Sequence, residues 1–200
     1  MNGLFDLTGR VALVTGAGSG IGRSTCEVLA GLGAQVVATD LDAGQADATV
    51  AALEGKDHLA ARLDVTAEAD WQAAHARVRE RYGRLDVLVN NAGIMLARGF
   101  AEAKVEDLRL QYRVNVEGPY IGMRTFLSLL QDTAAKHGAK PSIINISSVY
   151  GQVAGDRYAA YSASKGAIAM LSRAVAHELA ASGIRVNSVH PGPCATNLGA

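Results

Sequence analysis

Short apolar runs alternate with longer helical patterns along the chain, and this alternation restricts the possible folds more than any other feature. Several runs are nearly continuous in apolar residues, as strands covered on both faces should be. Strands alternating with helices predict right-handed βαβ units, and hence an α/β fold with a doubly wound parallel sheet between two helical layers. The expected strands are 11–15, 35–39, 59–63, 85–89, 142–146 and 184–189, and the expected helices are 21–32, 67–82, 105–130 and 158–181.

Two local signals bear on the expected helices. Thr66 precedes the pattern at 67–82 and is suited to be its N-cap. Pro119 lies inside the pattern at 105–130, which predicts a kink or a break there. No repeat, low-complexity tract or linker interrupts the chain, so residues 1–200 are expected to form one domain.

Composition argues against several classes of protein. Apolar residues make up 49% and charged residues 19%, which is typical of a globular protein. Nineteen basic and nineteen acidic residues balance without clusters, which argues against a nucleic-acid partner. Cys26 and Cys194 lie far apart, and neither they nor the five histidines show metal-ligand spacing. Free thiols and no metal site are therefore expected.

Targeting signals are the next consideration. Residues 1–10 carry no apolar signal-peptide core, and no apolar run reaches membrane-spanning length. Together with the two free cysteines, which suit a reducing compartment, this predicts a cytoplasmic protein without a membrane partner.

A glycine-rich turn joins the first expected strand to the first helix. Four of the seven residues from Gly16 to Gly22 are glycines, in the spacing T-G-x-x-x-G-x-G. Glycines let the backbone approach a pyrophosphate, and the helix N-terminus offers free N–H groups to it. A turn with glycines only for packing is the lesser alternative. The cofactor contacts expected here are Gly16, Ser19, Gly20, Ile21 and Gly22.

Asp40 closes the second expected strand, 18 residues after Gly22. A carboxylate there accepts hydrogen bonds from the adenosine ribose and repels a 2′-phosphate. No basic residue lies inside the glycine turn or directly after Asp40, so NAD is expected rather than NADP. The alternative is that Asp40 only caps a loop.

Tyr161 and Lys165 are four residues apart, so on a helix they share a face. A phenol with a pKa near 10 must fall by roughly three units, about 4 kcal/mol, to act as an acid/base near neutral pH. A fixed cation favours the charged form and so predicts a lowered pKa for Tyr161. Taken alone, the pair is a weak signal, and a tyrosine stem packed on a lysine stem is the favoured interpretation; the accompanying motifs change this.

These motifs, in this order, resemble the short-chain dehydrogenase/reductase family in its single-domain Rossmann branch. The similarity runs from Thr15 to Thr196, nearly the whole chain, and implies the strand order 3-2-1-4-5-6. Its elements are the glycine turn, Asp64-Val65, Asn90-Asn91-Ala92-Gly93, Asn115, Ser147-Ser148, Tyr161-x-x-x-Lys165 and Pro191-Gly192.

The resemblance implies further cofactor contacts. The Asp64 carboxylate would take the adenine amino group and the Val65 backbone would line the adenine pocket, although Asp64 could instead cap a loop. Asn90 would touch the cofactor ribose, with a purely structural turn as the competitor. The nearby small residues let the chain pass close to the ribose. The implied contacts are Asp64, Val65, Asn90, Asn91, Ala92, Gly93, Pro191, Gly192 and Thr196, the last three around the nicotinamide.

The resemblance also implies reversible hydride transfer between the nicotinamide and a secondary alcohol or ketone. Tyr161 is the implied acid/base, tuned by Lys165, which also holds the nicotinamide ribose. Ser148, 13 residues before Tyr161, would polarise the substrate oxygen. Asn115 would kink its helix so that its carbonyl holds a water on Lys165, and thereby close a proton relay. Tyr161 and Lys165 are also implied cofactor contacts. The substrate pocket candidates are Ile94, Met95, Tyr150, Gln152 and Tyr158, which suit sugars, hydroxyacids or cyclic alcohols.

The chain departs from the family pattern at its end. It stops at Ala200, eight residues after Gly192, so the family's lid and seventh strand are expected to be absent from this sequence. The helices at 105–130 and 158–181 resemble the pair that forms the family's dimer contact. A homodimer or homotetramer through them is therefore expected.

Two other functions stay open on the sequence. One is a catalytically idle NAD-binding module that senses redox state, which the intact Tyr161, Lys165 and Ser148 argue against. The other is an NADP-dependent reductase of the 3-oxoacyl type, which Asp40 argues against. Activity with a secondary alcohol and a comparison of NAD with NADP affinity would separate them.

Overall fold

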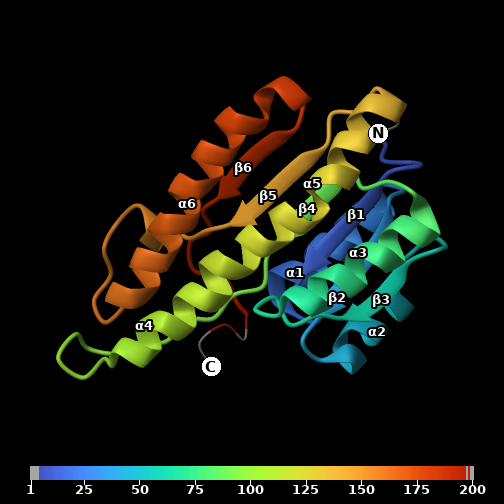
Figure 1. Ribbon diagram of the computed structural model, residues 1–200. Helices are drawn as coiled ribbons and strands as arrows, with labels where there is room; N and C mark the ends of the chain where they lie inside the picture. Colours follow the sequence, from blue (N-terminus) through green and yellow to red (C-terminus); the bar gives the residue numbers. More distant parts are fainter. Residues whose placement is uncertain (1–4, 197, 199–200) are drawn as a thin grey trace.

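A six-stranded parallel sheet forms the centre of the molecule in the computed structural model, which describes residues 5–196 and 198. Its strand order is β3-β2-β1-β4-β5-β6, as expected (Figure 1). All five neighbouring pairs are parallel, so the expected α/β fold is confirmed. The strands are β1 (Val11–Thr15), β2 (Gln35–Asp40), β3 (Leu59–Arg62), β4 (Val87–Asn90), β5 (Ser142–Ile146) and β6 (Arg185–Val189).

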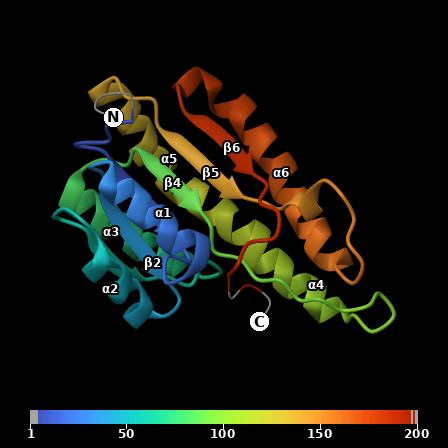
Figure 2. The ribbon, with the colours of Figure 1, turned by 180° about the vertical axis from the view of Figure 1, so that it is seen from behind.

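Helices cover the two faces of the sheet in separate layers. One apolar core contains Trp71, Phe126 and Ile143, with residues of three helices packed on one face. A second core contains Cys26, Val36 and residues of two helices on the other face (Figure 2). The first layer holds α3 (Glu68–Tyr82), α5 (Gly118–His137) and α6 (Ala159–Leu179), and the second holds α1 (Gly20–Gly31) and α2 (Ala43–Ala52).

The helix α3 begins differently from the sequence prediction. Its N-cap is Ala67, and no side chain caps it. The Thr66 hydroxyl instead donates to Asp64 Oδ1 at 2.8 Å, so the predicted Thr66 cap is wrong. A hydrogen-bonded turn after β3 therefore competes successfully for the threonine. The charge pattern of α3 is favourable without a cap, since its first turn is acidic and its last turn is basic.

The long pattern after β4 forms one extended helical element in three parts. The helix α4 (Val105–Tyr112) passes into a π-helical turn, Arg113–Glu117, and then into α5. Figure 1 shows the two α-helices following one another across the molecule. The interruption predicted at Pro119 thus lies one turn earlier. Pro119 itself stands in the first turn of α5, where a missing N–H is tolerated.

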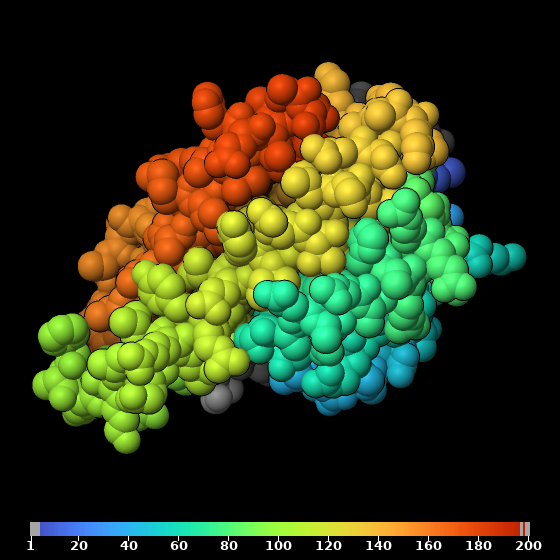
Figure 3. All heavy atoms as spheres, in the orientation of Figure 1, coloured from blue at the N-terminus to red at the C-terminus, as the bar shows by residue number. Residues whose placement is uncertain are grey.

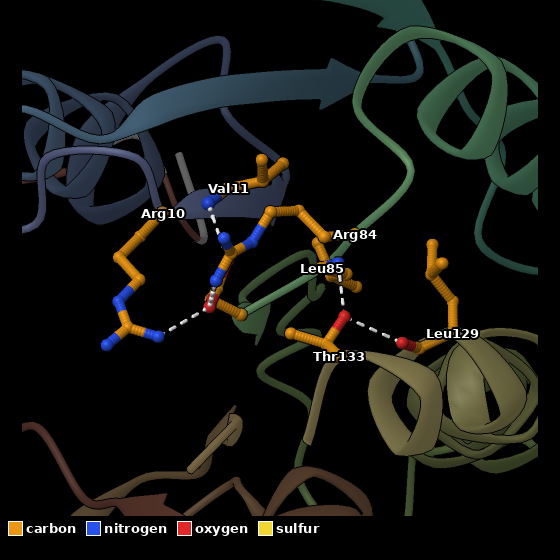
Figure 4. A network of polar contacts seen from close by, with 7 residues as sticks. Arg10, Val11, Arg84, Leu85, Leu129 and Thr133 are labelled. Atoms are coloured by element: carbon orange, nitrogen blue, oxygen red, sulfur yellow. Dashed lines mark hydrogen bonds and ion pairs between the residues drawn. The ribbon is translucent and has the colours of Figure 1, made fainter. Parts of the chain in front are cut away.

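Asp86 links two strands at the end of the sheet where the strands begin. Its carboxylate accepts hydrogen bonds from Arg10 at 3.0 Å, from Arg84 at 2.6 and 2.8 Å, and from the Val11 N–H at 2.9 Å (Figure 4). Burial alone would raise the pKa of Asp86, but the hydrogen bonds from Arg84, Val11 and Arg10 outweigh burial and leave that pKa below its ordinary value. This buried pairing joins the starts of β1 and β4.

The surface view shows α4 and the loop before it projecting from the body of the molecule (Figure 3). The exposed apolar side chains there are Phe100, Val105, Leu108 and Leu110. Within the described residues, no helix is both long enough and apolar enough to cross a membrane.

Candidate active site

A cavity of about 610 Å³ lies where the parallel strands end, at the point where the chain order reverses between β1 and β4. Ligands of open α/β sheets bind in such a place. Most residues singled out in the sequence line this cavity: Gly16, Ser19, Gly20, Ile21, Asp40, Asp64, Val65, Asn91, Ala92, Gly93, Ser148, Tyr161, Lys165, Pro191, Gly192 and Thr196. Gly22, Asn90 and Asn115 do not line it, and each has a contact of its own described below.

The glycine turn closes so tightly that side chains cannot replace its glycines. A Cβ on Gly22 would lie 2.1 Å from the Gly16 carbonyl oxygen, and one on Gly16 would lie 2.9 Å from Ala92 Cα. Gly16 and Gly20 also adopt positive φ angles of 61° and 51°. The turn leads into the N-terminus of α1, whose first N–H groups have no helical partner. These features fit a pyrophosphate, and Gly22, although outside the cavity wall, leaves the space that the Gly16 carbonyl occupies.

Asp40 is held in place at the end of β2. Its Oδ2 accepts a hydrogen bond from Gly18 N at 2.8 Å and its Oδ1 accepts one from Asp42 N at 3.1 Å. The carboxylate therefore does bind a loop, as the alternative reading held, and it also lines the cavity. Arg23, the residue after the glycine turn, donates to the Gly18 carbonyl and, at 3.3 Å, to Thr49 Oγ1.

The wall next to Asp64 is mostly apolar. Asp64 Oδ1 accepts from Thr66 N at 2.9 Å and from the Thr66 hydroxyl, and these bonds lower the pKa of Asp64. The Val65 carbonyl is occupied by Trp71 Nε1 at 2.9 Å. Leu41 and Leu63, which the sequence analysis missed, complete a slot suited to a flat base. Their only signal was their position directly after β2 and β3.

Two neighbouring asparagines at the end of β4, Asn90 and Asn91, make different contacts. Asn90 is 3% exposed and its side-chain amide donates to Asn145 Oδ1 at 2.8 Å, so the structure does not bring it to the cavity. The competing structural reading fits this position. Asn91 Nδ2 donates to the carbonyls of Thr15 and Gly16 at 2.9 and 3.1 Å. Asn91 therefore fastens the glycine turn to β4.

Asn115 lies in the π-helical turn and clamps the segment that follows Gly93. Its side chain accepts from Ile94 N and donates to Ile94 O, both at 2.9 Å, and also donates to Ser164 Oγ at 3.0 Å. A Cβ on Gly93 would lie 3.2 Å from Asn115 Oδ1 and 3.4 Å from Lys165 Nζ. The absent side chain of Gly93 therefore makes room for both groups. Pro119, four residues on, has no N–H for an α-helical bond to the Asn115 carbonyl.

Ser148, Tyr161 and Lys165 meet at the other end of the cavity. Ser147 also lines the cavity, but its hydroxyl donates to the Lys165 carbonyl at 2.7 Å. Ser148 Oγ accepts from Tyr150 N at 3.1 Å, and its hydroxyl is also within hydrogen-bonding reach of Tyr161. Tyr161 and Lys165 are each 3% exposed, so water is largely excluded from both.

The pKa of Tyr161 differs from the sequence expectation. Burial raises the pKa of Tyr161 above 10, and the hydrogen bond with Ser148 lowers it by less. Lys165 Nζ is 5.7 Å from the Tyr161 ring centre and donates to the Ile146 carbonyl at 2.8 Å. Burial lowers the pKa of Lys165 itself to about 8. The predicted lowering of the Tyr161 pKa is therefore wrong, because burial raises this pKa more than the hydrogen bond with Ser148 lowers it.

The segment after β6 closes the cavity next to the glycine turn. The Pro191 carbonyl accepts from Val149 N at 2.9 Å, which fixes the turn beside Ser148. Thr196 lies against Gly20, where an added Cβ would come within 3.0 Å of its methyl group. Cys194 is an exposed free thiol on the cavity wall. His190 Nδ1 contacts the Ser148 carbonyl at 3.1 Å.

The pocket candidates separate into two groups. Ile94, Met95, Tyr150 and Tyr158 line the cavity near Tyr161, whereas Gln152 does not. Among the residues from 5 to 196 and residue 198, no three histidine, cysteine, aspartate or glutamate side chains are grouped closely enough to hold a metal ion.

The comparison with known families agrees with this geometry. Residues 10–200 match the family described as short chain dehydrogenase, so the chain belongs to this family. The resemblance predicted from the motifs is confirmed, and with it the dehydrogenase class of enzyme.

Individual relatives are similar over most of the chain. A 3-beta-hydroxysteroid dehydrogenase of Comamonas testosteroni is 41% identical over 92% of this chain and 71% of its own. A trans-4-hydroxycyclohexanecarboxylate dehydrogenase of Sinomonas cyclohexanicum is 40% identical over 94% of this chain and 74% of its own. The crystal structure of a 3-ketoacyl-(acyl-carrier-protein) reductase from Brucella melitensis complexed with NADH has a TM-score of 0.92 at 34% identity, over 96% of this chain and 79% of that one.

Proposed function

We propose that this protein is an NAD-dependent dehydrogenase that interconverts a secondary alcohol and a ketone. The observation that carries the proposal is one continuous cavity, with the glycine turn and Asp40 at one end and Ser148, Tyr161 and Lys165 at the other. The first set of groups suits a dinucleotide and the second suits a reacting oxygen.

The chain's own groups would hold NAD along the whole cavity. The turn at 16–22 offers backbone N–H groups to the pyrophosphate, Asp40 accepts from the adenosine ribose, and Asp64 and Val65 border the adenine. The residues near the nicotinamide half would be Asn91, Ala92, Gly93, Lys165, Pro191, Gly192 and Thr196. Bound NAD supplies the hydride acceptor, so the residues need only supply position and charge.

Tyr161 is proposed to exchange the proton of the substrate oxygen. Because its pKa is raised, the phenol is protonated at neutral pH and is ready to donate to a ketone oxygen. In the direction of oxidation it must first lose that proton. Ser148 holds the same oxygen by donating a hydrogen bond. Lys165, kept in place by the Ile146 carbonyl, supplies the local positive charge. Asn115 positions this region, and the proton relay through its carbonyl remains part of the proposal.

Turnover tests the proposal directly. The protein with NAD and a panel of secondary alcohols should produce NADH, and Tyr161→Phe should abolish this while still binding NADH. Tyr82→Phe, which removes a phenol hydroxyl that donates to the Asp57 carbonyl outside the cavity, is the matched control and should keep full activity. Binding of NADH without turnover of any alcohol or ketone would favour the idle redox-sensing module. Tighter binding of NADPH than NADH would favour the NADP-dependent 3-oxoacyl-type reductase.

The protein is also proposed to form a homodimer or homotetramer through α4, α5 and α6. Apolar side chains lie exposed on these helices, namely Leu108, Leu110, Tyr120 and Met170. Light scattering of the purified protein tests the oligomer, and a monomer at all concentrations would contradict it.

The two free cysteines bear on the proposed compartment. A buried free Cys26 and an exposed free Cys194 suit a reducing compartment, consistent with the cytoplasm.

A further inference from the structure

Three tyrosine rings gather at the catalytic end of the cavity. Tyr150 comes from the 3₁₀ turn Val149–Gly151, Tyr158 directly precedes α6, and Tyr161 lies in its first turn. The rings of Tyr150 and Tyr158 are stacked, with centres 4.8 Å apart and planes 21° apart. Tyr161 meets both edge-on, at 6.4 and 6.3 Å. Tyr161, the proposed acid/base, therefore packs edge-on against the stacked rings of Tyr150 and Tyr158.

Backbone contacts hold this stack against the catalytic serine. The Tyr150 N–H donates to Ser148 Oγ at 3.1 Å. A Cβ on Gly155 would lie 2.6 Å from Tyr150 Cε1, so the ring occupies space that only a glycine leaves free. Tyr150 and Tyr158 are both partly exposed and both line the cavity. Within the described part of the chain, neither phenol oxygen has a hydrogen-bond partner.

Apolar side chains share this end of the cavity with the polar Ser147 and Ser148. Ile94 and Met95 line it, and Ile94 is fixed by the two hydrogen bonds to Asn115. The charged side chains among the described lining residues are Asp40, Asp64 and Lys165. The two aspartates belong to the end of the cavity assigned to the adenosine, and Lys165 is buried beside Tyr161. A substrate carboxylate or phosphate therefore finds no additional cation here.

We infer that Tyr150 and Tyr158 form a substrate-selecting wall, which favours a secondary alcohol carried on an apolar ring over an open-chain alcohol of equal carbon number. The inference rests on the proposed dehydrogenase function. A rigid ring can pack its C–H groups on aromatic surface and loses little conformational freedom on binding, unlike a chain with several rotatable bonds. Sugars and hydroxyacids, which suited the pocket on sequence grounds, are disfavoured by the same apolar surface.

Cyclohexanol and 2-hexanol test this wall, since they share a carbon count and a secondary hydroxyl. The wild-type protein with NAD should prefer cyclohexanol by about tenfold or more in kcat/KM. Tyr150→Leu and Tyr158→Leu should each reduce that preference by about fivefold, through a higher KM for cyclohexanol. Both variants should bind NADH as tightly as the wild-type protein, which shows that they are folded. Tyr158→Phe keeps the ring and should keep the preference.

Phe5→Leu is the matched control, because it also replaces an aromatic ring with leucine, and Phe5 is 63% exposed and does not line the cavity. A wild-type preference near one would overturn the inference, as would leucine variants that retain the wild-type preference. Calorimetric binding of cyclohexanone and 2-hexanone to the protein saturated with NADH makes the same comparison without turnover. Absent turnover combined with preferential binding of cyclohexanone would refute the dehydrogenase proposal and support the wall, whereas equal binding of the two ketones would refute the wall.

Discussion

At the end of the cavity next to α1, the groups that would meet a ligand are mostly backbone N–H groups, whereas at the end next to α6 they are side chains. The first end is shaped by positive φ angles and by glycines that leave no room for a Cβ. The second is shaped by the positions and pKa values of Ser148, Tyr161 and Lys165. Changes at the first end should therefore alter cofactor affinity, and changes at the second should alter the chemical step.

The sharpest test of this contrast is Tyr161→Phe. Removing the phenol hydroxyl should lower kcat for alcohol oxidation by about 10²- to 10⁴-fold, the usual contribution of a general acid/base. The affinity for NADH should change little, because the ring remains. Steady-state kinetics and fluorescence titration with NADH measure the two quantities. A large loss of NADH affinity would contradict the assignment of cofactor binding to one end of the cavity and of the chemical step to the other.

The pH dependence should reveal the raised pKa of Tyr161. Below that pKa, the deprotonated fraction rises tenfold per pH unit, so kcat/KM for alcohol oxidation should rise by up to about tenfold per unit between about pH 6 and pH 8. Above about pH 8, Lys165 loses its charge and the rise should weaken. Ketone reduction uses the protonated phenol and should be flat over the same range. A flat profile for oxidation would contradict the assignment of Tyr161.

Gly22→Ala should affect the other end. Its Cβ would meet the Gly16 carbonyl oxygen at 2.1 Å, and relieving such an overlap costs about 1–3 kcal/mol. We expect NADH affinity to fall by about tenfold to a hundredfold. Gly31→Ala, in the same helix, meets no atom within 4 Å and is the control. Equal NADH affinity in the two variants would show that the turn does not shape the binding site.

Asp40→Ser should reduce discrimination between the cofactors. Removing the carboxylate removes its repulsion of a 2′-phosphate, so the ratio of NADPH to NADH dissociation constants should fall by about tenfold. The loop contact with Gly18 N can persist through the serine hydroxyl. Titration of both cofactors against both proteins gives the ratio. An unchanged ratio would leave the loop contact as the role of Asp40.

Asp86→Ala lies far from both ends and should leave NADH affinity and kcat nearly unchanged. It removes the acceptor of two arginines and of the Val11 N–H, which should destabilise the fold by about 3 kcal/mol. Because the folded pKa of Asp86 is lowered, its contribution is present above its unfolded pKa and is lost as pH falls through the folded value. Denaturant unfolding at neutral and acidic pH should show a difference between variant and wild type that shrinks in acid.

The parts of the fold that depend on repeated patterns were predictable from the sequence. Strands at 11–15 and 142–146 appear with the expected bounds, since continuous apolar runs signal buried parallel strands. Thr66 was mistaken for a cap because its competing partner, Asp64, is a local loop contact that no periodicity encodes. The π-helical turn was located through Pro119 only to within one turn.

In the candidate site too, features set by local geometry were predictable from the sequence, and features set by tertiary packing were not. Glycine spacing and the Tyr161–Lys165 interval showed which groups meet, because both depend on local geometry. The burial of Asn90 and the bond from Lys165 to the Ile146 carbonyl depend on tertiary packing, and nothing in one sequence signals them. The direction of the Tyr161 pKa shift was missed for this reason. The stacking of Tyr150 on Tyr158 likewise needed coordinates.

The π-helical turn at Arg113–Glu117 makes this protein sensitive to deletion of a single residue. Such a turn takes up one residue more than an α-helical turn. Deleting one residue there would shift the register of α5 against α4 by about 100°. Either Phe126 and Leu129 would leave the core, or Asn115 would lose its grip on Ile94. Substitutions at the other positions of this turn would keep the register of α5, whereas deletion of a single residue would disturb either the core or the active site.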